Sequence, residues 1–141
     1  MRIIETLDRH DAEHAILAMR DALFVDEQAA VVCVADVHGD LIALLRVDGA
    51  PPSSVTIAMN KAWTAAREGV RTYDIGQRVK SQDAAARFDI AYYGDARYIG
   101  WGGGVPVLRE GRVVGSVAVS GLPELEDQRI AELGVVAILA R

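Results

Sequence analysis

The fold is decided by one stretch of the chain, Trp101-Gly102-Gly103-Gly104-Val105-Pro106-Val107 followed by Gly111-Arg112-Val113-Val114-Gly115-Ser116-Val117-Ala118-Val119-Ser120-Gly121. Two β-branched runs, Val105–Val107 and Val113–Val119, flank a polar Glu110-Gly111 corner, and this pattern predicts a β-hairpin. Three successive glycines stand at the mouth of the hairpin. Because glycine lets the backbone approach other groups closely, this loop is either a tight bend or a place where a ligand meets backbone N–H groups.

A second hairpin and three helices complete the pattern. The runs Ala30–Asp36 and Leu41–Val47 are apolar, and the turn His38-Gly39-Asp40 joins them. Apolar stripes at helical spacing predict helices over residues 6–26, 53–69 and 123–140. Between these, Gln82–Phe88 is a candidate short helix and Tyr92–Asp95 is typical of a turn. Hairpins joined to helices predict a single α+β domain over residues 1–141, with an antiparallel sheet flanked by helices.

Composition narrows the classes of function. The 141 residues carry a net charge of −5 and their basic residues are scattered, so no nucleic-acid partner is expected. No segment is apolar for long enough to span a membrane, and the first residues lack a secretion signal. The single cysteine, Cys33, lies in an apolar run and is expected to be a buried structural thiol. We therefore expect a cytoplasmic protein.

Several motifs in order resemble the haem-binding HbpS-like family, which includes GlcG-like proteins and the C-terminal domain of PduO-type cobalamin adenosyltransferases. The motifs are Val34-Ala35-Asp36-Val37-His38-Gly39-Asp40-Leu41, Arg46-Val47-Asp48-Gly49-Ala50, Asn60-Lys61-Ala62-Trp63-Thr64-Ala65, Gly102-Gly103-Gly104-Val105-Pro106 and Gly115-Ser116-Val117-Ala118-Val119-Ser120-Gly121, with Asp127 just beyond.

The resemblance implies an α-β-α sandwich that forms homo-oligomers and binds haem or another tetrapyrrole. The chain departs from the family pattern in the loop that would face a ligand. Leu122 replaces the usual second glycine, and Leu125-Glu126-Asp127 replaces the common Glu-Gln-Asp run.

Three candidate catalytic residues follow from the helices. Lys61 lies among small alanines, so partial burial would lower its pKa and suit it to base, Schiff-base or anion-binding work; alternatively, its stem only packs on the sheet. Glu126 and Asp127 lie in the first turn of the last helix, where they either complement the helix dipole or act as a general acid or base. The sequence predicts that these residues and Gly102–Gly104 converge on one cleft.

Further candidates concern a flat ligand. His10 and His14 lie four residues apart on one helical face, where they are either haem-iron ligands or part of a solvated polar surface. Trp101 and Tyr93 flank the glycine loop and either line a ligand pocket or belong to the core or a subunit interface.

Two functions stay open at this level. The first is binding of a small molecule, with haem or another tetrapyrrole implied by the resemblance. The alternative is a cofactor-independent enzyme of proton-transfer, isomerase or lyase type, acting on a small anionic or aromatic catabolite. In the enzyme, Lys61 and Glu126 or Asp127 would move protons while N–H groups of Gly102–Gly104 hold an oxyanion. A homo-oligomer is expected because the last helix carries more apolar residues than one sheet face requires.

Overall fold

A computed structural model describes all residues, 1–141, and shows a four-stranded antiparallel sheet between two layers of helices. The strands are β1 (Val31–Ala35), β2 (Leu41–Arg46), β3 (Gly104–Arg109) and β4 (Arg112–Ser120), in the spatial order β2-β1-β4-β3. The main helices are α1 (Arg9–Val25), α2 (Ser54–Glu68) and α4 (Glu124–Leu139). The expected fold class, both hairpins and the three main helices are confirmed, with boundaries that differ by up to three residues.

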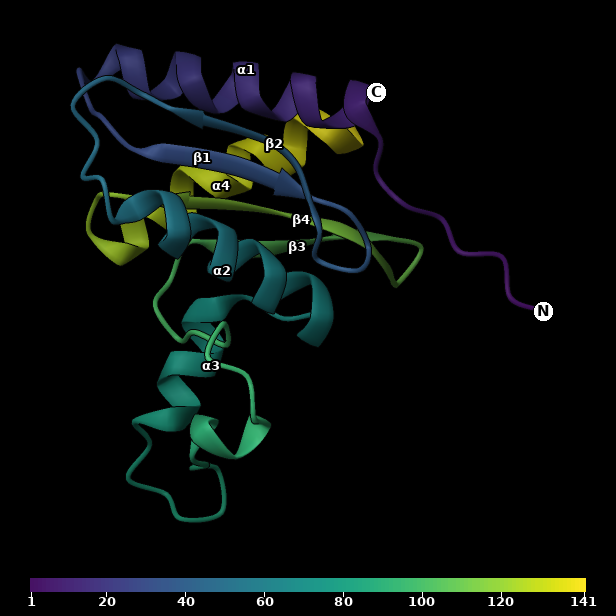
Figure 1. Cartoon of the computed structure of the whole chain (residues 1–141), viewed down its shortest axis with the longest axis vertical. Helices are drawn as coiled ribbons and strands as arrows, with labels where there is room; N and C mark the ends of the chain where they lie inside the picture. Colours follow the sequence, from purple (N-terminus) through teal and green to yellow (C-terminus); the bar gives the residue numbers. More distant parts are fainter.

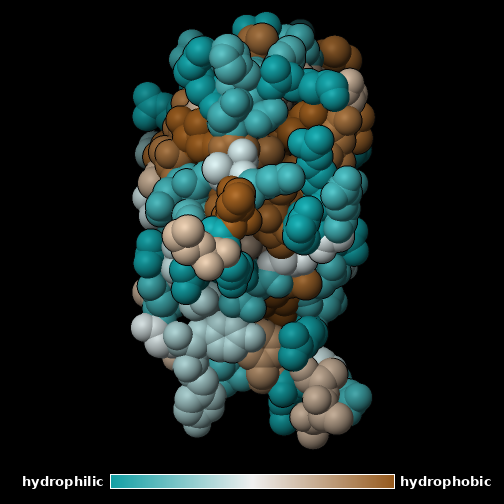
Figure 2. Space-filling view, turned by 90° about the vertical axis from the view of Figure 1, so that its right-hand side faces the viewer, coloured by the Kyte–Doolittle hydropathy of each residue, from teal (hydrophilic) through white to brown (hydrophobic).

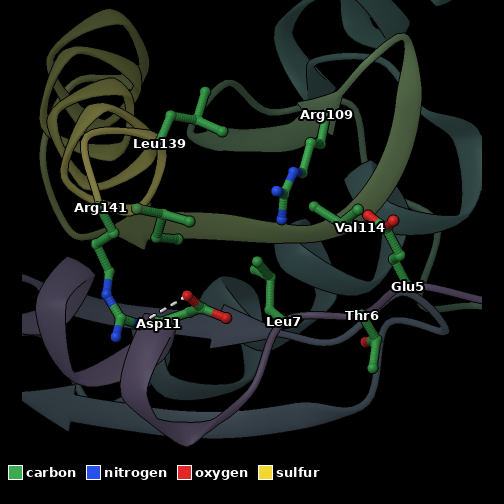
Figure 3. Close-up of a pocket in the computed structure, with 9 residues that line it drawn as sticks. Glu5, Thr6, Leu7, Asp11, Arg109, Val114, Leu139 and Arg141 are labelled. Atoms are coloured by element: carbon green, nitrogen blue, oxygen red, sulfur yellow. Dashed lines mark hydrogen bonds and ion pairs between the residues drawn. The ribbon is translucent and has the colours of Figure 1, made fainter.

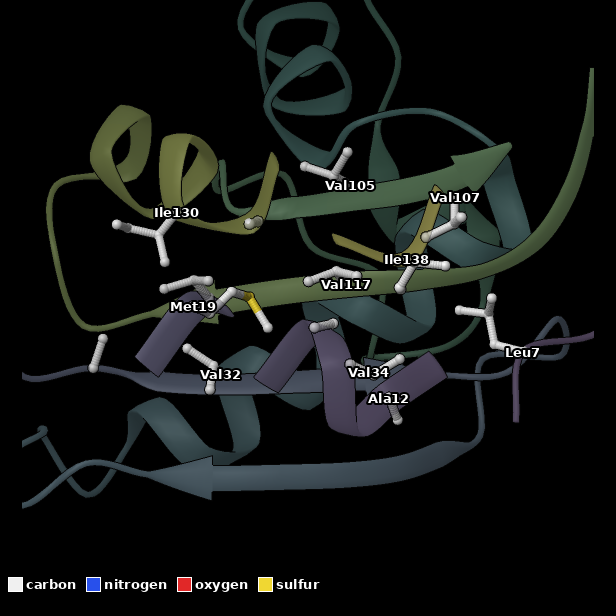
Figure 4. Close-up of a cluster of buried hydrophobic side chains, with 14 of the residues drawn as sticks. Leu7, Ala12, Met19, Val32, Val34, Val105, Val107, Val117, Ile130 and Ile138 are labelled. Carbon is white, nitrogen blue, oxygen red and sulfur yellow. The ribbon is translucent and has the colours of Figure 1, made fainter. Parts of the chain in front are cut away.

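The two helical layers differ in composition. Helices α1 and α4 cover one face of the sheet and α2 covers the other (Figure 1). The thicker core lies under α1 and α4, where Met19, Val32, Val117 and Ile130 interdigitate (Figure 4). The core under α2 is built mostly from alanines, which let this helix approach the sheet so closely that the Ser116 hydroxyl donates to the carbonyl of Ala62 at 2.6 Å.

The region between α2 and β3 is where the sequence-based prediction was wrong. Helix α3 (Thr72–Val79) forms where none was expected, whereas the candidate helix over Gln82–Phe88 is only a turn. A short 3₁₀ helix, η1, spans Ile90–Tyr93. Helix α3 lies with its backbone close to the segment before the glycine loop, since a Cβ on Gly76 would collide with the carbonyl oxygen of Gly100. This contact places α3 against the segment that leads into the glycine loop. No periodic pattern in the sequence predicts such a contact.

The ends of α1 are defined locally. Asp8 caps the helix by accepting a hydrogen bond from the N–H of Asp11, whose carboxylate in turn accepts from the N–H of Asp8. The helix runs antiparallel to α4, since Asp26 at its C-terminus pairs with Arg129 and Asp11 at its N-terminus pairs with Arg141. No helix is both long and apolar enough to cross a membrane.

Candidate functional site

A buried ion pair lies at the end of the sheet where the glycine loop meets α4. Lys61 projects from α2, and its ammonium group donates to Asp127 Oδ2 at 3.1 Å and to the carbonyl of Val119 at 2.9 Å. The two side chains are only 3% and 2% exposed. The alanines beside Lys61 on α2 leave room for the lysine stem between helix and sheet. The pair thus joins α2, β4 and α4 through one contact.

Asp127 is held from two sides. It lies in the first turn of α4, where the helix dipole favours a negative charge, and its Oδ1 accepts a hydrogen bond from the N–H of Leu122 at 3.0 Å. Burial nevertheless raises the pKa of Asp127 to about 6, because these partners only partly offset the loss of water. Burial likewise lowers the pKa of Lys61 below its usual value, and the Asp127 carboxylate opposes that shift. Both groups are therefore easier to neutralise than they would be at the surface.

The glycine loop closes over this pair. Gly103 has φ +131°, and a Cβ there would lie 2.8 Å from Lys61 Nζ and would collide with the carbonyl oxygen of Val119. The Gly102 N–H donates to Glu124 Oε2 at 2.9 Å and the Gly104 N–H donates to Thr72 Oγ1 at 2.9 Å. The expectation that all three N–H groups are free to hold an oxyanion is therefore wrong for Gly102 and Gly104, because residues of the chain already occupy them.

A cavity of about 410 Å³ opens beside the pair. Lys61, Asp127 and Glu124 line it together with Ser120, Gly121 and two exposed side chains, Lys80 and Trp101. Lys61, the glycine loop and Asp127 meet at the buried pair as expected, but Gly102–Gly104 and Glu126 do not line the cavity. The chemistry available there is a buried acid–base pair, a second carboxylate, a lysine at the rim and an indole ring.

Other expected site residues lie elsewhere. Glu126 points away from Lys61 and pairs with Arg129 at 2.6 Å, and hydrogen bonding to that guanidinium lowers the pKa of Glu126. Tyr93 stacks on Phe88 with their ring centroids 5.3 Å apart and does not line the cavity. The structure therefore leaves Asp127 and Trp101 beside Lys61 and separates Glu126 and Tyr93 from it.

The two histidines lie on the opposite side of the sheet, on α1. Both are exposed, and the imidazole of His10 lies 3.2 Å from a guanidinium nitrogen of Arg9, whereas His14 has no hydrogen-bond partner. Cys33 is buried as expected; its thiol donates to the carbonyl of Ala58, and burial raises the pKa of the thiol to about 12.

Three residues of the site were missed from the sequence. Glu124 precedes Asp127 by three positions in the same helical turn, and this spacing was the available signal. Thr72 and Lys80 lie in and just after α3, the helix that the sequence did not reveal, so no local pattern pointed to them.

These features define a class of protein, a small α-β-α domain with a buried Lys–Asp pair under a glycine loop. The profile of the family described as haem degrading protein HbpS-like matches residues 7–136, and the chain belongs to this family. A relative in Citrobacter freundii, an uncharacterised 15.0 kDa protein in the dhaT-dhaS intergenic region, is 34% identical over 72% of this chain and 70% of its own length.

Solved structures agree with the family assignment. The Klebsiella pneumoniae protein ORFY superposes with a TM-score of 0.90 at 27% identity, covering 100% of this chain and 96% of its own. A structure described as a PduOC:heme complex superposes with a TM-score of 0.84 at 26% identity, covering 94% of each chain. The fold of this chain is therefore the fold of a domain that has been solved with haem.

Proposed function

We propose that this protein binds haem or a related tetrapyrrole. The observation that carries the proposal is the likeness over nearly the whole chain to the PduOC:heme complex, within a family described as haem degrading. A bound haem would supply an iron centre whose chemistry depends on the axial ligand and on the polarity around it. The residues of this chain would hold the ring, orient it and provide that ligand.

The outer face of α1 fits such a group. Imidazole is a common axial ligand of haem iron, and the exposed His14 has no partner in the chain to compete for it. One helical turn further on, Leu17 is 48% exposed. On the neighbouring helix α4, Leu133 and Val136 are 38% and 63% exposed. An exposed histidine on α1 and exposed apolar side chains on α1 and α4 are the groups that a flat, apolar ring with a central metal requires.

The cavity beside Lys61 fits the ring less well. Its lining is mostly polar or charged, it contains no histidine, and Lys61 Nζ already donates to Asp127 and Val119. His14 is accordingly our first choice for the iron and His10, which lies against Arg9, is the second.

As part of the same proposal, the protein forms a homo-oligomer. Leu17, Phe24, Leu133, Val136 and Leu139 expose apolar area on α1 and α4, which a second copy would cover. A haem held at this surface would then lie between subunits.

The test is a haem titration of the purified protein, followed by the Soret band. We expect a shifted Soret band in the wild type and in His10→Ala, and a loss of at least tenfold in affinity in His14→Ala. The matched control is His38→Ala, an exposed histidine in the β1–β2 turn, which should leave the titration unchanged. An identical spectrum and affinity after replacing both His10 and His14 would exclude histidine ligation, and no saturable haem binding in the wild type would refute the function itself.

A second candidate function is proton transfer on a small anionic or aromatic compound. The observation that favours it is the position of Asp127, a buried carboxyl with a pKa of about 6 beside a 410 Å³ cavity, since a general acid or base works best with a pKa near the working pH. In this role Asp127 exchanges the proton, and Lys61 supplies positive charge. Glu126 has no part in it, because its carboxylate is held by Arg129 outside the cavity.

Exchange of carbon-bound hydrogen for deuterium tests this candidate. The protein would be incubated in D₂O with a panel of small keto acids and aromatic carboxylates and followed by NMR. Asp127→Asn, checked for folding by circular dichroism, should abolish any exchange that the wild type catalyses. Equal exchange in both proteins would show that Asp127 is not the base.

A further inference from the structure

A second cavity of about 410 Å³ lies on the α1/α4 side of the sheet, away from the Lys61 pair (Figure 3). Four parts of the chain build it: the segment before α1, the first turn of α1, the β3–β4 hairpin, and the end of α4 with the residues that follow. The face of the molecule that carries the β3–β4 turn and the N-terminal segment shows hydrophobic side chains gathered in its upper half (Figure 2). This cavity lies away from the proposed proton-transfer site, and it shares only Leu139 with the apolar surface on α1 and α4 that is proposed to meet a second copy.

The walls of this cavity are anchored. The N–H of Leu7 donates to the carbonyl of Val114 at 2.8 Å, and the N–H of Val37 donates to Thr6 Oγ1 at 3.0 Å, so the segment before α1 is tied to the sheet. Leu7, Val114 and Ile138 are each only 6% exposed and provide an apolar floor, to which Leu139 adds a half-exposed apolar edge. The hollow is thus bounded by chain segments that hydrogen bonds and packing hold in place.

One cation faces the cavity without a partner. Arg109 ends β3 two residues after the core residue Val107, and its side chain points into the hollow toward Leu7 and Val114 (Figure 3). Its guanidinium makes no hydrogen bond and no ion pair within the chain. The other arginine of the cavity, Arg141, is already neutralised by Asp11, whose carboxylate lies 2.8 Å away.

The charged side chains that line the cavity determine which class of ligand it can bind. Arg109 offers a planar donor group that matches one carboxylate. Glu5, which also lines the cavity and has no ion-pair partner, disfavours a second negative charge. The floor requires an apolar body. We infer that this cavity binds an amphipathic monocarboxylate, with its carboxylate on Arg109 and its apolar part on Leu7, Val114 and Leu139.

The experiment is a calorimetric titration of the full chain with octanoate, kept below its micelle concentration. We expect saturable binding that Arg109→Gln weakens about ten- to hundredfold, the range for loss of a charged hydrogen-bonded contact. The matched control is Arg112→Gln, since Arg112 stands opposite Arg109 in the hairpin, pairs loosely with Glu110 and does not line the cavity. It should leave octanoate binding unchanged.

Two further comparisons define the ligand class. Octanol and the dicarboxylate suberate should bind much more weakly than octanoate, and Glu5→Gln should tighten octanoate binding a few-fold by removing a nearby negative charge. Equal affinity of wild type and Arg109→Gln, equal affinity for octanol and octanoate, or no binding at millimolar octanoate would each overturn the inference. Because Arg109 and His14 lie in different places, His14→Ala should leave octanoate binding intact, so failure of the haem proposal would not affect this result.

Discussion

Lys61 and Asp127 lie in the interior and satisfy each other, whereas His10 and His14 stand on the outer face of α1 with few neighbours. Both regions carry side chains that can bind a proton or a charged ligand. They differ in whether those side chains already have partners within the chain. The hydrogen bonds of the interior pair tie α2, β4 and α4 together before any ligand arrives. The imidazole of His14 makes none and remains available. The difference shows that burial commits a charged pair to holding the fold together, whereas an exposed imidazole without a partner keeps its nitrogen free for a ligand.

The largest expected effect comes from breaking the interior pair. Lys61→Met should destabilise the protein by about 3–5 kcal/mol, because it leaves the Asp127 carboxylate buried without its partner. The double variant Lys61→Met/Asp127→Leu should recover much of this loss, since an apolar pair of similar size carries no unpaired charge. Urea unfolding measures both. Lys80→Met, at the exposed rim of the same cavity, is the control and should stay within about 0.5 kcal/mol of the wild type. A small effect of Lys61→Met would mean that the pair is dispensable for folding.

The second largest effect on stability is expected at Gly103, which covers the Lys61–Asp127 pair. Gly103→Ala should cost about 2–3 kcal/mol, because the new Cβ would collide with the carbonyl of Val119 in a backbone conformation that alanine rarely adopts. Gly94→Ala separates the two causes, since Gly94 also has a positive φ, +76°, but has open space around its Cβ position. We expect it to cost about 1 kcal/mol, measured in the same unfolding experiment. An equal loss of unfolding free energy in the two variants would show that the collision of the new Cβ at Gly103 does not contribute to the destabilisation.

The pH dependence of stability sharpens the comparison. The pKa of Asp127 is about 6 in the folded chain against an ordinary value of 3.8, so between these values the folded state binds more protons than the unfolded state. The contribution of Asp127 is therefore fully present below about pH 4 and is lost as the pH rises through about 6. We expect a decline of about 3 kcal/mol across this range that Asp127→Asn lacks. Exposed carboxylates titrate alike in both proteins, so the difference between the two pH profiles isolates Asp127. Parallel profiles would contradict a raised pKa.

The smallest effect is expected on the exposed side. His14→Ala should change the free energy of unfolding by no more than about 0.5 kcal/mol, because the imidazole has no partner in the chain. Thermal unfolding without haem measures this, and addition of haem should raise the melting temperature of the wild type but not of the variant. A large loss of stability without haem would mean that His14 has a structural role, and the contrast with Lys61 would disappear.

Much of the fold could be predicted from the sequence, because its signals are local. Apolar runs on either side of Glu110-Gly111 and His38-Gly39 predict both hairpins, and apolar stripes predict α1, α2 and α4. Helix α3 escaped prediction, and the close approach of Gly76 to Gly100 that accompanies it joins two residues far apart in the chain. Because α3 was not predicted, Thr72 and Lys80 were not recognised as residues of the site.

The sequence by itself determined that Lys61, the glycine loop and the start of the last helix belong to one region, because the topology of the hairpins brings them to the same end of the sheet. Only the tertiary structure decided how they meet. A helical turn presents Glu124, Glu126 and Asp127 in different directions, and the packing of α4 turns Asp127 toward Lys61, Glu124 toward Gly102, and Glu126 outward to Arg129. The unpaired Arg109 likewise became visible only in three dimensions, because the absence of a partner depends on every segment that packs around it.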